Sequence, residues 1–289
     1  MAIVPNPPVT ASGPRLEVRA LRPRECPPVL TRLRARAHDE LFLIDLVRQL
    51  ARGEPEVEIF AAWRGGTLVG LASARPTIVL ETGLDADVLT ALVGPLATLS
   101  MGLIRAPAPI VEPLWAGLAP RRRRALVDRL EISLILEPES FAPRDPPAGV
   151  RVRPAGRQDL DRLVEAARAS LREENRPDPF LGDPRGFRRW VTSRHQRALV
   201  AERGGRVVWV GYADVQLVDG WLLQGVYSWP DQRRGGLAAA GVSALCRQAF
   251  AANARHVQLS VVEGNTAAIA LYTQLGFFPH TTLRTLLFA

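Results

Sequence analysis

PDQRRGGLAAAGVSALCRQAFAA, residues 230 to 252, is the stretch on which the fold prediction rests. It follows an apolar, strand-like run and leads into an alanine- and leucine-rich helix. A strand, a glycine turn and a helix start bind anions, because the free N–H groups and the positive end of the helix dipole face the ligand. Gly235 and Gly236 would let a diphosphate approach the backbone, and Arg233 and Arg234 add positive charge beside it. The stretch therefore predicts an anion site.

A second pattern follows one strand later. HVQLSVVEGN (256–265) has the composition of a strand, and TAAIALYTQLGF (266–277) that of a helix ending at Gly276. Asn265 stands at the expected N-cap, and Tyr272 lies seven residues further on. Seven residues are nearly two helical turns, so both side chains project from one side. Alone, each residue is more often a cap or a core aromatic; together, behind the glycine loop, they favour a shared site.

These two patterns resemble the two diagnostic motifs of the GCN5-related N-acetyltransferase (GNAT) superfamily. The coenzyme A loop, Gln/Arg-x-x-Gly-x-Gly/Ala, corresponds to Arg233-x-x-Gly236-x-Ala238. The second motif, Asn-x-x-Ala-x-x-Leu-Tyr-x-x-x-Gly-Phe, corresponds to the run from Asn265 to Phe277. The resemblance is specific over the C-terminal half and only architectural before it. It implies acetyl-CoA as cosubstrate, no metal, and direct acyl transfer to a primary amine of a small molecule or peptide.

The resemblance also implies roles for individual residues. The strand entering the loop, WLLQGVYSW (221–229), would bend at Gly225, splay from its neighbour and offer backbone groups to the pantetheine arm. Tyr272 would be the general acid, since a phenol with a pKa of about 10 is protonated at neutral pH yet can pass a proton to a thiolate. The implied cofactor-binding residues are Val226, Ser228, Arg233, Arg234, Gly235, Gly236, Leu237, Ala238, Asn265 and Tyr272.

The general base is left open by the residues. Many superfamily members carry a glutamate on the strand that enters the loop, whereas this strand has only Gln224, which accepts no proton at neutral pH. We take Glu174 as the first candidate for the base. The alternatives are a water-relayed base, an amine that arrives neutral, or one of Glu173, Asp214 and His195.

The chain repeats its own layout. FAAWRGGTLVGLA and LVAERGGRVVWVGYA each place an Arg-Gly-Gly hairpin between short apolar strands, 139 residues apart (204 minus 65). We interpret this as a duplication, with coincidence between common Gly-Gly hairpins as the alternative. The predicted fold is mixed α/β, of the α+β type: two tandem GNAT-like domains, each a twisted, mostly antiparallel sheet flanked by helices. The expected parts are a disordered N-terminus (1–14), a degenerate domain (15–136), a proline-rich linker (137–149) and the catalytic domain (150–289).

The N-terminal half lacks the glycine loop. TIVLETGLDADVLTALVG (77–94) has no arginine and glycine pair before its helix, and Glu81, Asp85 and Asp87 make it acidic. We therefore expect one cofactor site, in the C-terminal half. This layout resembles two-domain bacterial acetyltransferases, and a pocket between the domains is the default place for the acceptor.

Composition excludes several classes of protein. No apolar run approaches the roughly 20 residues that span a bilayer, and two cysteines provide neither a disulfide framework nor a structural zinc site. We expect a cytoplasmic protein. The net charge of +8 comes from 37 scattered arginines without any lysine, and only Arg121–Arg124 form a run, so nucleic acid is not favoured. An acyl-CoA sensor without turnover is the alternative function, and homodimerisation stays open.

Overall fold

The computed structural model describes residues 15–119, 123–178, 180 and 182–289. The expected disordered N-terminus lies outside the described residues, as do two members of the Arg121–Arg124 run. The third member, Arg123, donates hydrogen bonds to the carbonyls of Ala97 (2.6 Å) and Leu118 (2.8 Å). Arg123 therefore stabilises the carboxyl ends of two helices, where carbonyls lack helical partners.

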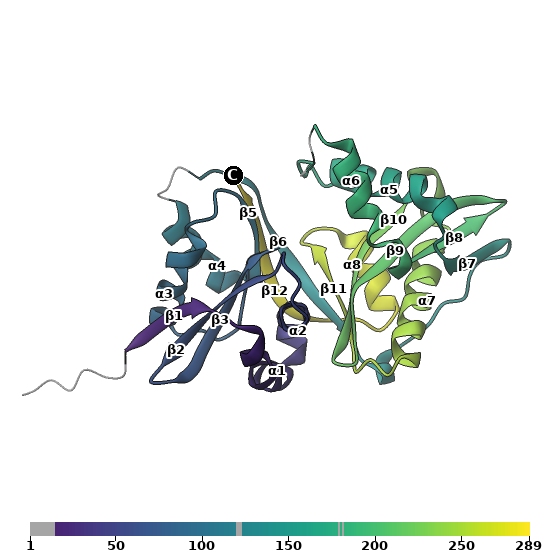
Figure 1. The fold of residues 1–289 in the computed structure, drawn as a ribbon. Helices are drawn as coiled ribbons and strands as arrows, with labels where there is room; N and C mark the ends of the chain where they lie inside the picture. The colour runs from purple at the N-terminus through teal and green to yellow at the C-terminus, as the bar shows by residue number, and fades with distance from the viewer. Residues whose placement is uncertain (1–14, 120–122, 179, 181) are drawn as a thin grey trace, which may run out of the picture.

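The N-terminal half combines a small sheet with four helices around it (Figure 1). The first two helices are separated by a turn at residues 35 and 36. The elements are β1 (Leu16–Ala20), η1 (Pro23–Glu25), α1 (Cys26–Arg34), α2 (Ala37–Ala51), β2 (Glu58–Arg64), β3 (Thr67–Arg75), β4 (Val79–Leu80), α3 (Ala86–Leu96), β5 (Gly102–Pro107), α4 (Ala108–Leu118), β6 (Ala125–Leu136) and η3 (Pro138–Ser140).

The C-terminal half contains the strands and helices expected between residues 221 and 277, and it ends with a strand, β12, that no sequence motif marked. The elements are β7 (Val150–Pro154), η4 (Arg157–Asp159), α5 (Leu160–Glu173), α6 (Pro184–Thr192), η5 (His195–Arg197), β8 (Ala198–Arg203), β9 (Arg206–Leu217), β10 (Gly220–Ser228), η6 (Pro230–Gln232), α7 (Leu237–Ala251), β11 (Val257–Val262), α8 (Thr266–Gln274) and β12 (Phe278–Phe288). No helix among the described residues is long and apolar enough to cross a bilayer.

The predicted mixed α/β fold with two sheets is confirmed. One sheet has the order β1-β2-β3-β4 and the other β5-β12-β6-β11-β10-β9-β8-β7. In both halves the glycine hairpin has two successive residues at positive φ, 57° and 83° at Gly65 and Gly66, 56° and 75° at Gly204 and Gly205. This is the backbone of a two-residue hairpin turn that matches the twist of the strands. The shared turn geometry supports the duplication.

The larger sheet joins the two halves by exchanged strands. β6, the last strand of the N-terminal half, pairs antiparallel with β11 of the C-terminal half, with Ser133 opposite Ser260. β12, the last strand of the C-terminal half, lies between β6 and β5 and pairs with both. In Figure 1 the yellow strand β12 lies among strands of the teal N-terminal half. The residues 137–149 separate the halves along the chain, but the hydrogen bonding of the sheet crosses from one to the other.

Helix α7 packs very closely on the sheet of the C-terminal half. Trp209 of β9 is fully buried beneath it. A Cβ atom at Gly241 of α7 would lie 2.4 Å from the Trp209 ring. This glycine therefore lets the helix approach the sheet, which fixes where the first turn of α7 stands.

His256 gives the junction of the halves a pH dependence. Its ring is fully buried, lies edge-on to His38 of α2 at 4.4 Å between centroids, and contacts Gln258 at 3.1 Å. Burial is the main cause that lowers the pKa of His256 to about 4, and His38 and His280 act in the same direction. Gln258 and Asp219 act in the opposite direction, toward a higher pKa. Since an unfolded histidine titrates near 6.5, the unfolded chain binds more protons between these values.

We expect the free energy of unfolding to fall as the pH drops from 6.5 to 4.5. The share due to His256 is roughly 2 to 3 kcal/mol, because each pKa unit corresponds to about 1.4 kcal/mol. Urea unfolding of the wild type and of His256→Gln at both pH values isolates this share. An equal pH-dependent loss in the two proteins would contradict it.

Candidate active site

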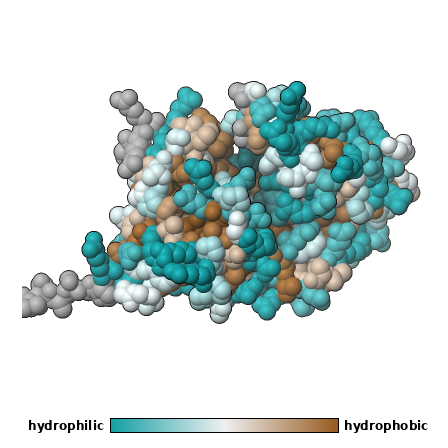
Figure 2. All heavy atoms as spheres, in the orientation of Figure 1, coloured by the Kyte–Doolittle hydropathy of each residue, from teal (hydrophilic) through white to brown (hydrophobic). Residues whose placement is uncertain are grey.

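A cavity of about 430 Å³ lies between the two halves. From the N-terminal half it is lined by residues of α2, β5 and β6, and from the C-terminal half by α5, α6, α8 and strands β9 to β12. Figure 2 shows this face of the molecule indented between the two halves. Both halves therefore contribute walls to one site.

Strands β10 and β11 separate beside this cavity. They pair in parallel only at Trp221 and Leu222, and the register of β10 on β9 shifts between Gln224 and Tyr227. Gly225, inside the shift, has φ +58°, and a Cβ atom there would lie 2.0 Å from the Tyr212 ring. Both the backbone conformation and the contact require glycine. The predicted bend and splay are present, and they place Val226 in the cavity wall, outside the register with β9.

The glycine loop leaves the start of α7 without a side-chain cap. Gly236, at the N-cap, has φ +75°, and Arg234 before it has φ +62°. The first N–H groups of α7, at Leu237 and Ala238, therefore stand at an uncapped helix start, as an anion site requires. Gly235 lies between the two residues of positive φ, with the nearest contact of an added Cβ atom at 3.7 Å.

Arg233 is already paired, which the sequence did not indicate. Its Nη2 lies 2.6 Å from a carboxylate oxygen of Glu173, and its Nε donates to the carbonyl of Ser228 at 3.1 Å. The other oxygen of Glu173 accepts from the Tyr227 hydroxyl at 2.9 Å. Glu173 thus joins α5 to the glycine loop and is not among the residues lining the cavity. Of the two loop arginines, Arg234 makes no ion pair with any described residue.

Asn265 and Tyr272 both line the cavity. Asn265 caps α8, its Oδ1 accepting from the Ala268 N–H at 3.1 Å, so its amide NH₂ remains available. Tyr272 is 6 % exposed, and none of the described residues hydrogen bonds its hydroxyl. Burial raises the pKa of Tyr272 above its ordinary value. The phenol is therefore protonated at neutral pH, and it is a weaker acid than the sequence alone suggests.

Residues 160–277 match the acetyltransferase (GNAT) family. The C-terminal half of the chain thus carries a GNAT family segment. This segment contains the splayed strands, the glycine loop and the helix that carries Tyr272. No curated protein matches the chain in sequence.

Solved structures share the fold over nearly the whole chain. A protein from Drosophila has 15 % identity and a TM-score of 0.71, with 93 % of this chain and 98 % of that chain covered. A GCN5-related N-acetyltransferase from Sphaerobacter thermophilus has 16 % identity, a TM-score of 0.63 and 95 % coverage of both chains. A tandem GNAT protein from the clavulanic acid biosynthesis pathway has 13 % identity, a TM-score of 0.57, and coverage of 95 % and 97 %. The fold is therefore the tandem GNAT fold.

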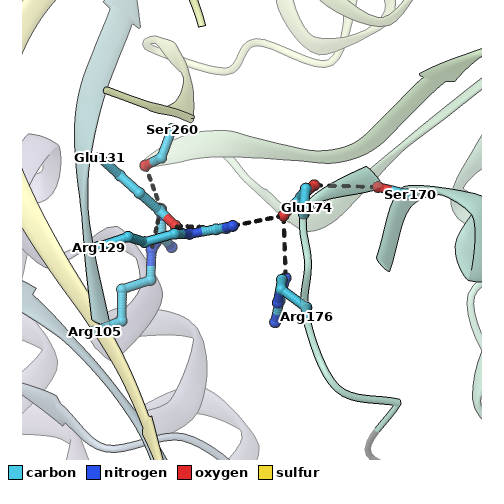
Figure 3. A network of polar contacts seen from close by, with 7 residues as sticks. All are labelled: Arg105, Arg129, Glu131, Ser170, Glu174, Arg176 and Ser260. Atoms are coloured by element: carbon cyan, nitrogen blue, oxygen red, sulfur yellow. Dashed lines mark hydrogen bonds and ion pairs between the residues drawn. The ribbon is translucent and has the colours of Figure 1, made fainter. Parts of the chain in front are cut away.

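Glu174, the first candidate for the base, lies in the cavity wall, and each of its oxygens accepts a hydrogen bond (Figure 3). One oxygen accepts from Arg129 Nη1 at 2.8 Å and lies 3.8 Å from Arg176 Nη1. The other accepts from the Ser170 hydroxyl at 3.1 Å. The oxygen bound by Ser170 has a second lone pair, but the other oxygen is held in the ion pair with Arg129.

His195 lies in the cavity wall in a better orientation for a base. Its Nδ1 is 2.7 Å from the carbonyl oxygen of Thr192. A carbonyl only accepts, so Nδ1 carries the hydrogen, and in the neutral ring Nε2 holds the free lone pair. Asp214, the remaining candidate, also lines the cavity and lies 3.5 Å from Arg194 Nε. The geometry favours His195 over both carboxylates.

The corresponding turn of the N-terminal half is surrounded by carboxylates. The N–H of Thr82, four residues before α3, donates to the buried carboxylate of Glu40 at 2.8 Å, and burial raises the pKa of Glu40. Glu81 pairs with Arg32 at 2.7 Å, and Asp87 with Arg64. These contacts agree with the expectation that this turn holds no diphosphate.

No sequence pattern indicated three charged cavity residues of the N-terminal half: Arg105, Arg129 and Glu131. They stand on β5 and β6, which reach the C-terminal half only through the exchanged strands. Alternation of charged residues with apolar ones in β6 indicates which side chains share a face, but not which cavity that face meets.

Proposed function

We propose that the protein is an acetyl-CoA-dependent N-acetyltransferase that transfers the acetyl group directly to a primary amine. The observation that carries the proposal is the meeting of Val226, Asn265 and Tyr272 in one cavity. The uncapped start of α7, which is not among the residues lining that cavity, would receive the diphosphate. When bound, acetyl-CoA supplies the activated acyl group as a thioester. The decisive measurements are calorimetric titration with acetyl-CoA and thiol release over a panel of amines; absence of acetyl-CoA binding would refute the proposal.

The loop residues would hold the cofactor by charge and by backbone donors. The N–H groups of Gly236, Leu237 and Ala238 would receive the diphosphate, and Arg234 is the arginine that is free to neutralise it. Val226 would offer backbone groups to the pantetheine arm. The contribution of Ser228 is smaller than the resemblance implied, because its carbonyl already accepts from Arg233.

Tyr272 would donate the proton to the departing thiolate. We expect Tyr272→Phe to lower kcat roughly tenfold to a hundredfold, since general acids contribute about this much or more. The affinity for acetyl-CoA should stay unchanged, because the phenyl ring that packs in the core remains. Tyr227→Phe is the matched control: its hydroxyl contacts Glu173 away from the cavity, and kcat should hold. A Tyr272→Phe enzyme with wild-type kcat would exclude the role.

We propose His195 as the general base ahead of Glu174. His195→Gln should lower kcat/KM at least tenfold, since the free Nε2 lone pair is lost. Glu174→Gln should cost less, because the glutamine oxygen can still accept from Arg129 while its amide group donates to the Ser170 hydroxyl. Steady-state kinetics of the two variants compare them, and a larger loss for Glu174→Gln would reverse the assignment.

The N-terminal domain, which we place at 15–136, would shape the acceptor end of the cavity of the catalytic domain at 150–289. Its contribution of Arg105, Arg129 and Glu131 to the walls supports this role. A cytoplasmic location, as expected from the sequence, belongs to the same proposal.

A second candidate function is an acyl-CoA sensor without turnover. It is favoured by Gln224 on the entering strand and by the occupied carboxylate of Glu174. Acetyl-CoA binding without thiol release, for every amine in the panel, would select it.

A further inference from the structure

The walls of the cavity carry one positive charge more than they carry negative charges. Among the described residues that line it, four are arginines and three are carboxylates. They are Arg105, Arg129, Arg176 and Arg194 against Glu131, Glu174 and Asp214. An unpaired charge removed from water is costly unless a ligand or partner of opposite charge compensates it. The imbalance therefore indicates a monoanionic group on the molecule that enters this cavity.

The ion-pair distances show which of these arginines lack a close carboxylate partner. Arg129 lies 2.8 Å from both Glu131 and Glu174. Arg194 lies 3.5 Å from Asp214. Arg105 lies 3.8 Å from its nearest carboxylate, Glu131, and Arg176 lies 3.8 Å from Glu174. Both of these carboxylates already bind Arg129 more closely. The excess charge thus belongs to Arg105 and Arg176.

Arg105 is the more buried of the two, with 17 % of its side chain exposed against 30 % for Arg176. It stands on β5 and reaches Ser260 of β11, to whose hydroxyl its Nη2 donates (Figure 3). A guanidinium has five N–H donors, so most of its donors find no partner among the described residues. Burial also lowers the pKa of Arg105.

Thr285 of β12 adds an independent observation. It is paired in register with Arg105 on one side and with Arg129 on the other, and it lines the cavity. Its hydroxyl oxygen is buried and has no hydrogen-bond partner in the described chain. A buried hydroxyl without a partner is rare. Arg105 and Thr285 therefore present neighbouring donors that no described residue accepts, beside Arg129, which is paired with Glu131 and Glu174.

We propose that the acceptor is an amine that also carries a carboxylate, as amino acids and peptides do, and that Arg105 binds this carboxylate. The inference rests on the proposed acetyltransferase function and names its substrate class. A carboxylate matches the single excess charge, and its two oxygens in one plane match the guanidinium fork. A phosphate monoester, with a charge near −2, would exceed the available positive charge.

The test compares amines that differ only in the anionic group. The probes are amino acids and dipeptides, the corresponding C-terminal amides, and aminoalkyl phosphates, each assayed by thiol release at saturating acetyl-CoA and by calorimetry on the coenzyme A complex. For the best substrate, we expect kcat/KM of the free-carboxylate form to be at least tenfold higher than that of its C-terminal amide. The difference should hold even though the amine of the amide form is less basic. Arg105→Gln should reduce this preference to within threefold, and Arg105→Lys should retain part of it.

Arg284→Gln is the matched control. Arg284 neighbours Thr285 on β12, pairs with Asp128 and Glu112, and is absent from the cavity lining, so the carboxylate preference should persist. The inference is overturned if amides or phosphates react and bind as well as carboxylates, if Arg105→Gln keeps the preference, or if no carboxylate probe is bound or acetylated. If the wild type still binds acetyl-CoA in these cases, only the carboxylate inference is wrong and the proposed cofactor site is unaffected. If the wild type does not bind acetyl-CoA, the proposed function itself is refuted.

Discussion

Deletion of residues 278–289 should abolish folding of both halves, although the deleted segment belongs to the C-terminal half. β12 pairs with β6 along its length and with β5 over six residues. It also buries Leu286 and Phe288 completely, in the core of the N-terminal half. Each buried side chain of this kind is worth about 1.5 to 3 kcal/mol, and the lost strand pairing adds to it, against a total stability of about 5 to 15 kcal/mol. Circular dichroism and solubility on expression are the measurements.

Two point variants on β12 give a milder form of the same test. Leu286→Asp places a charge in the core of the N-terminal half and should lower the melting temperature by more than 10 °C or prevent folding. Phe278→Asp, at a position 42 % exposed on the same strand, should change it by only a few degrees. A truncated chain that stays soluble, with an intact melting transition for either half, would show that the exchanged strand is dispensable.

Gly236→Glu should reduce the affinity for acetyl-CoA more than a thousandfold. The substitution puts a carboxylate where the diphosphate would approach the first N–H groups of α7. Two charge-assisted hydrogen bonds, at about 1.5 to 3 kcal/mol each, and the repulsion between like charges account for this loss. Calorimetric titration measures it directly.

Gly53→Glu is the matched control for backbone strain. Gly53 has φ +79°, close to the +75° of Gly236, and a Cβ atom there meets nothing within 4 Å. In both variants the introduced glutamate must adopt a left-handed backbone conformation, which lowers the free energy of unfolding by a similar amount, about 1 to 2 kcal/mol. Only Gly236→Glu should lose the cofactor. Comparable affinities in the two variants would mean that the glycine loop is not the cofactor site.

Local patterns predicted the glycine loop and the bend of β10 because each depends on the backbone of a few neighbouring residues. The glycine loop requires positive φ at Gly236, and the bend requires glycine at 225, so both leave a signature in a few residues. The spacing of Asn265 and Tyr272 on one helix likewise predicted that they share a site, and both line the cavity. The Arg-Gly-Gly hairpins of both halves were predicted for the same reason, from the glycine pair at the turn.

The acceptor side could not be predicted, because it depends on which strands become neighbours. β12, FPHTTLRTLLF, does not alternate cleanly, and no pattern within it names β5 and β6 as partners. Without that pairing, Arg105 is one arginine among 37. The orientation of His195 is similar: its contact with the Thr192 carbonyl exists only once α6 ends in the turn that precedes it.

The strand exchange also constrains how the protein is made. β5 ends at residue 107 and its partner β12 begins at residue 278, so 171 further residues must be synthesised before the pair can form (278 minus 107). At about 5 to 20 residues per second, an edge of the growing chain stays open for roughly 10 to 30 seconds. Open strand edges invite pairing with other chains. The ribosome-bound nascent chain is therefore the form of this protein most exposed to aggregation, and slower translation of the second half should lower the yield of folded protein.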